Sequence, residues 1–123
     1  MKRDMDLIRL LLLELEGESD VKESLSKYSD DQRNFHKALL LEAGFVIGPS
    51  PVYSGRGGKD CDKIPARVHI HRITWQGYEF LEKICNETIW AQIKQTIIEK
   101  GLSFPIDTIS YVYTVVVKSL FGQ

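Results

Sequence analysis

The stretch from residue 29 to residue 74 constrains the fold most, because it joins a strongly marked helix to a glycine-rich turn between two short apolar runs. It begins with a capping box, in which the Ser29 hydroxyl and the Gln32 amide each satisfy a free backbone N–H group. Apolar residues then recur at helical spacing, and Gly44 supplies the left-handed residue that ends a helix. We therefore predict a helix over residues 30–43.

A β-hairpin is predicted to follow this helix. Residues 45–47 are apolar and favour a strand, residues 55–58 favour a turn, and residues 68–71 favour a returning strand. Thr74 is then placed to cap another helix. This order is that of a winged-helix unit. The sequence thus predicts an α+β fold, a winged-helix-like domain of helices and a β-hairpin wing, with additional C-terminal helices.

Composition limits what this core can belong to. The chain has 123 residues, of which 43% are hydrophobic and 27% charged, and this is the make-up of an ordinary globular domain. We expect a single domain over residues 1–123, because a chain of this length has room for one hydrophobic core. The formal net charge of −1 gives no general attraction for nucleic acid, so DNA binding would require a local basic patch.

The sequence indicates a cytoplasmic protein. No apolar run approaches the roughly 20 residues of a membrane-spanning helix, because Arg9 and Glu14 flank residues 10–13. No secretory signal is recognisable. Cys61 and Cys85 lie far apart and form no C-x-x-C motif, so a reduced setting is expected.

Further helices are predicted on both sides of the central stretch. Asp4 is a plausible N-cap for a leucine-rich core helix that ends near Gly17. Residues 17–27 are polar and favour a short helix only weakly, although a helix-turn-helix requires one there. After Thr74, two helices or one bent helix are expected, with Trp75 and Trp90 as core anchors. The apolar faces of this part comprise Tyr78, Leu81, Ile84 and Cys85, and then Ile89, Trp90, Ile93 and Ile97.

The last helix is predicted over residues 103–121, with Pro105 in its first turn. Its polar residues form one narrow stripe, which favours a helix over a strand despite three consecutive valines. The remaining surface is broadly apolar, and monomers seldom expose large apolar patches. We therefore expect a homodimer through this helix. The interface would include Ile109, Val112, Val116 and Leu120.

Two sets of residues resemble known families. His36, Leu39, Leu40, Ala43, Gly44 and Phe45 follow the register H-x-x-L-L-x-x-A-G-L/F. This register resembles the recognition helix and following strand of winged-helix repressors of the arsenic-sensor and multidrug-resistance types. The opening MKRDMDLIR and the later RITWQGYEFL resemble a more particular family of small uncharacterised bacterial and prophage proteins, over nearly the whole chain. This second resemblance implies a winged-helix-like fold and a bacterial or phage setting, and it brings no established activity.

The candidate contacts to double-stranded DNA are five basic residues of the central stretch, namely Arg33, Lys37, Arg56, Lys59 and Arg67. The first two lie one turn apart on the predicted recognition helix, and the others lie in the hairpin, where a wing reaches phosphates or a minor groove. Asp30 and Asp31 oppose DNA binding, because carboxylates at the start of a recognition helix repel phosphates. The helix dipole alone explains both aspartates, at a few tenths to about 1 kcal/mol each.

The hairpin also contains residue types that ligate metals. His69 and His71 would point to one side of a strand, and Cys61 with Asp60 or Asp62 would complete a set. The spacing matches no familiar zinc module, and polar side chains that face water on an edge strand explain the two histidines equally well. We therefore expect no metal.

Two binding functions remain, because no nucleophile, base and orienting group occur in a recognisable arrangement and we expect neither an enzyme nor a cofactor. The first is a small bacterial or phage DNA-associated regulator, favoured by the basic hairpin and the repressor-like register. The alternative is a phage-encoded protein-interaction module that inhibits or modulates a host protein without binding DNA. The near-neutral net charge and the acidic helix start favour this alternative.

Overall fold

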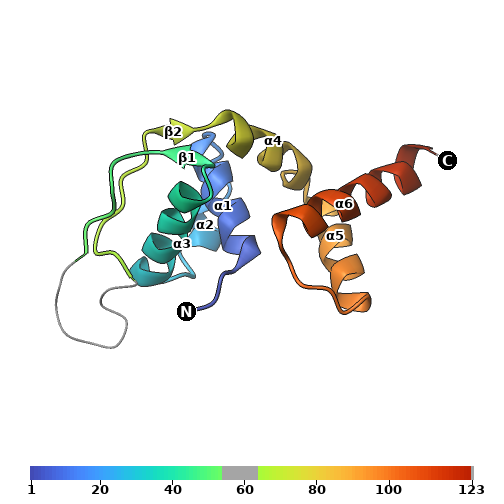
Figure 1. The fold of residues 1–123 in the computed structure, drawn as a ribbon, viewed down its shortest axis with the longest axis horizontal. Helices are drawn as coiled ribbons and strands as arrows, with labels where there is room; N and C mark the ends of the chain where they lie inside the picture. The colour runs from blue at the N-terminus through green and yellow to red at the C-terminus, as the bar shows by residue number, and fades with distance from the viewer. Residues whose placement is uncertain (54–63, 123) are drawn as a thin grey trace. The chain divides into compact units, whose positions relative to one another are not determined.

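The computed structural model of the chain describes residues 1–53 and 64–122 (Figure 1). Helices predominate, and the sheet of the described residues has two antiparallel strands, so the fold is α+β as predicted. Contacts between residues group the chain into two compact units, Met1–Tyr78 and Glu79–Gln123. This grouping leaves the single domain a prediction, since a cluster as short as the second unit is smaller than most domains that fold alone.

Three helices open the first unit: α1 (Met5–Leu15), α2 (Lys22–Leu25) and α3 (Asp30–Glu42). α1 packs against both α2 and α3. The leucine-rich helix and the long helix after Ser29 are confirmed, and α2 supplies the short helix that the sequence favoured only weakly. The buried apolar residues of these helices are Met5, Leu7, Ile8, Leu11, Leu12, Leu13, Leu25 and Leu40.

Both long helices begin with the predicted caps. Asp4 Oδ1 accepts hydrogen bonds from the N–H groups of Asp6 and Leu7 at 2.9 and 3.3 Å. The Ser29 hydroxyl oxygen accepts the Gln32 N–H at 3.1 Å, and the Gln32 side-chain oxygen accepts the Ser29 N–H at 2.8 Å. The capping box is therefore confirmed in both of its hydrogen bonds.

The hairpin pairs β1 (Val46–Ile47) with β2 (Arg72–Ile73), and an isolated bridge joins Val52 to Arg67 further along its arms. The strand predicted over residues 68–71 is wrong, because the ladder begins only at β2. Proline lacks the N–H group that a ladder needs, and the opposite arm carries two prolines, Pro49 and Pro51. The turn predicted at residues 55–58 lies outside the described residues.

Thr74 caps α4 (Trp75–Ile84) as predicted, since its hydroxyl oxygen accepts the Gly77 N–H at 3.1 Å. A Cβ atom at Gly77 would lie 2.1 Å from the Phe45 carbonyl oxygen, so α4 approaches the chain before β1 closely enough to require glycine. Trp75 was predicted as a core anchor, and this is wrong because its side chain is 76% exposed. Two residues along a helix turn it by about 200°, so burial of Gly77 directs Trp75 outward.

The second unit contains α5 (Glu87–Glu99) and α6 (Ile106–Val117), followed by the π-helical turn η1 (Lys118–Gly122). Two separate helices thus follow Thr74, and Asn86 Oδ1 caps the second by accepting the Ile89 N–H at 2.9 Å. α5 and α6 pack against each other. Trp90 is buried, as predicted, whereas Tyr78 and Cys85 of the predicted apolar face are exposed. The C-terminal segment is helical, as predicted, although α6 begins at Ile106 and Pro105 is its N-cap rather than a residue of its first turn.

None of the helices in the described ranges is both long and apolar enough to cross a membrane.

Candidate nucleic-acid interface and adjoining pocket

The returning arm of the hairpin presents a basic and aromatic face. Arg67, His69 and His71 are exposed, whereas Val68 and Ile70 between them are partly covered. Exposed and partly covered side chains thus alternate along this arm, as they do in an extended segment. The imidazole rings of His69 and His71 meet edge to face, with 5.0 Å between their centroids. We call residues 67–72 the basic arm, since exposed Arg72 ends it.

The basic arm continues a segment that packs on α3. The Asn34 side-chain nitrogen of α3 donates to the Ala66 carbonyl oxygen at 3.1 Å, and the Val52 N–H donates to the Arg67 carbonyl oxygen at 2.9 Å. In Figure 1 the two arms of the hairpin run alongside α3. The arm is therefore held by its backbone, while the side chain of Arg67 stays exposed.

The basic residues predicted on α3 are less available than Arg67. Arg33 donates from Nη1 to the Leu25 carbonyl oxygen at 3.0 Å and forms an ion pair with Asp30, so its guanidinium links α2 to the start of α3. Lys37 is only partly exposed and lines a pocket. Arg56 and Lys59 lie outside the described residues. Arg33 and Lys37 thus lie on one helix. Among the predicted residues that the structure describes, Arg67 has the most exposed side chain.

A buried histidine connects α3 to the start of α1, and the sequence reasoning did not assign it this role. His36 is 1% exposed, donates from Nδ1 to the Gln32 carbonyl oxygen at 2.7 Å and accepts the Asp4 N–H at Nε2 at 2.8 Å. Burial lowers the pKa of His36, although the bond to the Gln32 carbonyl and the charge of Asp4 oppose this. The ring is therefore neutral and structural.

The same aspartate accepts a further hydrogen bond from Tyr28. The Tyr28 hydroxyl donates to Asp4 Oδ2 at 3.3 Å. Burial raises the pKa of Tyr28, and the neighbouring Asp4 carboxylate raises it further. Together His36, Asp4 and Tyr28 join the start of α1 to α3 and to the segment between α2 and α3, so this network stabilises the frame rather than binding a ligand.

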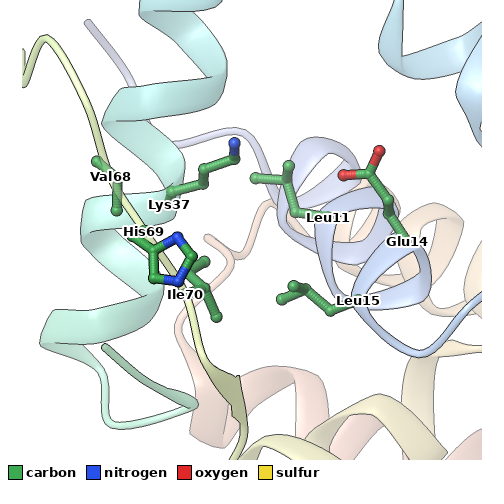
Figure 2. Close-up of a pocket in the computed structure, with 7 residues that line it drawn as sticks. All are labelled: Leu11, Glu14, Leu15, Lys37, Val68, His69 and Ile70. Atoms are coloured by element: carbon green, nitrogen blue, oxygen red, sulfur yellow. The ribbon is translucent and has the colours of Figure 1, made fainter. Parts of the chain in front are cut away.

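Several hollows border the described part of the hairpin. A groove of about 570 Å³ lies between the C-terminal half of α3 and the first arm. Its apolar lining includes Ala38, Leu41, Ile47, Pro49, Pro51 and Tyr53. A smaller pocket of about 220 Å³ lies among α1, α3 and the basic arm (Figure 2). The groove is lined by one stretch of the chain, residues 38–53, whereas the smaller pocket is lined by segments far apart along the chain, so no local pattern predicts it.

The metal prediction is tested only in part of the chain. Among the described residues, no three His, Cys, Asp or Glu side chains lie together as a metal site. Cys61, Asp60 and Asp62 fall outside those residues, so the absence of a metal stays a prediction.

The residues predicted for a dimer interface differ in exposure. Ile109, Val112 and Val116 are buried in the single chain, whereas Leu120 is 45% exposed. Other apolar side chains of the same segment are also exposed, namely Tyr111, Val115 and Phe121. The first three predicted residues are therefore already covered, and any second copy would meet the outer face instead. The dimer itself stays a prediction.

Comparison with known proteins identifies the family. A family model described as a hypothetical protein, DUF2513, matches residues 2–103. The chain belongs to the DUF2513 family. An uncharacterized protein of Haemophilus influenzae is 34% identical over 127 residues, which cover 99% of this chain and 100% of that protein. No solved structure matches this DUF2513 protein. Membership of a family of unknown function is thus confirmed, while the winged-helix resemblance and the prophage origin stay predictions.

Proposed function

We propose that this DUF2513 protein is a small DNA-associated regulator of bacterial or phage origin, whose first unit is a winged-helix-like module. The basic arm is the observation that carries the proposal. Residues 56–72 contain five basic and two acidic residues, and the described end of this segment exposes Arg67, His69, His71 and Arg72. A local excess of positive charge on a hairpin is what phosphate binding requires in a chain without a global excess.

The order of three helices and an antiparallel hairpin supports the winged-helix assignment. In such modules the third helix enters the major groove while the wing contacts the backbone. Here the start of α3 carries Asp30 and Asp31, and Arg33 is already engaged by Asp30 and the Leu25 carbonyl. We therefore assign most of the phosphate attraction to the hairpin, through Arg56, Lys59 and Arg67, with Lys37 as a minor contributor.

The test compares variants of the hairpin with a matched control. Each lost phosphate contact reduces the steepness of log affinity against log salt by about one unit. The double variant Arg56→Ala with Lys59→Ala should therefore reduce this slope by about two units. Arg67→Ala should remove about one. Lys22→Ala deletes an exposed cation of α2, away from the hairpin, and should leave the slope unchanged. Equal slopes in all four proteins would refute the assignment to the hairpin.

A second candidate is a phage-encoded protein-interaction module that modulates a host protein without binding DNA. The groove beside α3 favours it, because apolar Leu41, Ile47 and Tyr53 contribute to its lining and partner surfaces combine apolar with polar residues. Asp31 is exposed at the other end of α3 and would also suit a protein rather than DNA. Under this alternative, duplex DNA fails to bind even at low salt.

The remaining proposals concern the state of the protein. We propose a non-enzymatic, cytoplasmic homodimer without a cofactor, in which the exposed face of the C-terminal segment forms the contact. Tyr111, Val115, Leu120 and Phe121 are exposed apolar residues there. Exposed apolar side chains of a terminal helical segment support association with a second copy.

A further inference from the structure

The smaller pocket of the first unit has the chemistry of a ligand site. Its lining contains four apolar side chains together with one acidic, one basic and one imidazole side chain. Figure 2 shows all of its lining residues, which are Leu11, Glu14, Leu15, Lys37, Val68, His69 and Ile70. Small-molecule sites are typically apolar concavities with a few convergent polar groups.

Lys37 supplies the positive charge of this lining. It is partly covered, and its ammonium group makes no hydrogen bond or ion pair with any residue in ranges 1–53 and 64–122. An ammonium group has three donors, and partial removal from water without an acceptor costs free energy. A carboxylate in the pocket would supply that acceptor, and the imidazole of His69 also lines the pocket.

Glu14 gives the rim its opposite charge. It projects from α1 on the far side of Leu11 from Lys37, so an acid and a base flank one apolar side chain (Figure 2). A ligand with a single negative charge would satisfy Lys37 and be repelled by Glu14. A ligand with one charge of each sign satisfies both, because the two rim charges cancel.

The size of the pocket limits the ligand further. Its volume of about 220 Å³ lies below the roughly 300–1,000 Å³ of sites for drug-sized molecules. The pocket is therefore too small to bury a whole nucleotide or a peptide of several residues. Leu15, Val68 and Ile70 leave an apolar wall for a short aliphatic group.

We propose that this pocket binds a free aliphatic α-amino acid. The ligand carboxylate binds Lys37 and His69, its ammonium group binds Glu14, and its side chain packs on Leu11 and Leu15. This site lies beyond the proposed DNA function and does not depend on it, since the rim charges face a small ligand whether or not the hairpin meets phosphate.

Calorimetric titration of the full chain with three probes that share the leucine side chain tests the proposal. L-leucine carries both charges, 4-methylpentanoate lacks the ammonium group, and 3-methylbutylamine lacks the carboxylate. L-leucine should bind with one site per chain, and each of the other two should bind at least about tenfold more weakly, or about 1.4 kcal/mol. L-leucine that shows no binding at ~10 mM, or no advantage over both analogues, would overturn the proposal.

Variants then assign the two charges. Lys37→Met should lower the affinity for L-leucine by at least about tenfold. Lys22→Met is the matched control and should leave this affinity unchanged. Glu14→Gln should lower the affinity for L-leucine. It should not lower the affinity for 4-methylpentanoate, because that probe has no ammonium group. Glu14 is exposed, so this variant keeps the test decisive even if Lys37→Met unfolds. Affinity for L-leucine that is insensitive to Glu14→Gln, or to a folded Lys37→Met, would overturn the assignment.

Discussion

His36 should make the stability of the first unit depend on pH. Only the neutral imidazole can accept the Asp4 N–H at Nε2, because protonation converts that nitrogen into a donor. Burial is the main cause that lowers the His36 pKa from its ordinary value of 6.5. The His36 imidazole therefore binds a proton more weakly in the folded chain than in the unfolded chain.

The direction of the effect follows from proton binding in the two states. Between the lowered folded-state pKa and 6.5, the unfolded chain binds more protons, so the free energy of unfolding rises with pH. The contribution of His36 is fully present above pH 6.5 and is lost as the pH falls toward the folded-state pKa. One titrating group gives a slope of at most about 1.4 kcal/mol per pH unit.

Urea unfolding followed by circular dichroism, at pH values from about 5 to about 7.5, measures this slope across the range in which histidine titrates. His36→Leu should cost about 1–3 kcal/mol at neutral pH, because the Asp4 N–H loses its acceptor, and should flatten the profile. His69→Gln alters an exposed histidine and should retain the slope. A slope that is equal in the wild type and His36→Leu would refute the reasoning.

Three further outcomes are expected. Gly77→Ala should destabilise the chain by at least about 2 kcal/mol in urea unfolding, because the new Cβ meets the Phe45 carbonyl. Alanine normally stabilises a helix interior by about 1 kcal/mol relative to glycine, so a gain would disprove that contact. Tyr111→Glu with Val115→Glu should shift a dimer to monomer in sedimentation velocity without lowering the melting temperature, and a monomeric wild type would contradict the dimer. A chelator should leave the melting temperature unchanged, whereas stoichiometric metal in protein purified without added ions would contradict this.

The helices could be predicted from the sequence because their signals are local. The bonds between Ser29 and Gln32, and those from Asp4 to the first turn of α1, join residues two or three apart, so a short window of sequence contains both partners. The end of α3 is equally local, since Gly44 adopts a positive φ of 77°.

The errors arose where contacts distant in sequence decide the structure. Trp75 has the size of a core anchor, yet the close approach of Gly77 to Phe45 fixes which side of α4 faces inward. Residues 68–71 alternate as a strand does, and this local pattern predicted a returning strand before β2. Pairing also requires donors on the other arm, and Pro49 has none there.

The candidate site was predictable only in outline. The alternation through His69 and His71 indicated side chains that face water on the returning arm, and both side chains are exposed. The engagement of Arg33 by the Leu25 carbonyl was not predictable, since α2 was itself uncertain. The pocket around Lys37 depends on how α1 packs beside the hairpin, and no periodic pattern encodes that contact.

The salt dependence of DNA binding tests the central claim most directly. The wild-type protein is titrated into a fluorescent duplex from upstream of its own gene, and into an unrelated duplex, at several salt concentrations. Contacts from Arg56, Lys59 and Arg67 predict that log affinity falls with log salt with a slope of about −2.7. A slope near zero, or no binding to either duplex below about 50 mM salt, would contradict the regulator and leave the protein-interaction module as the function to test.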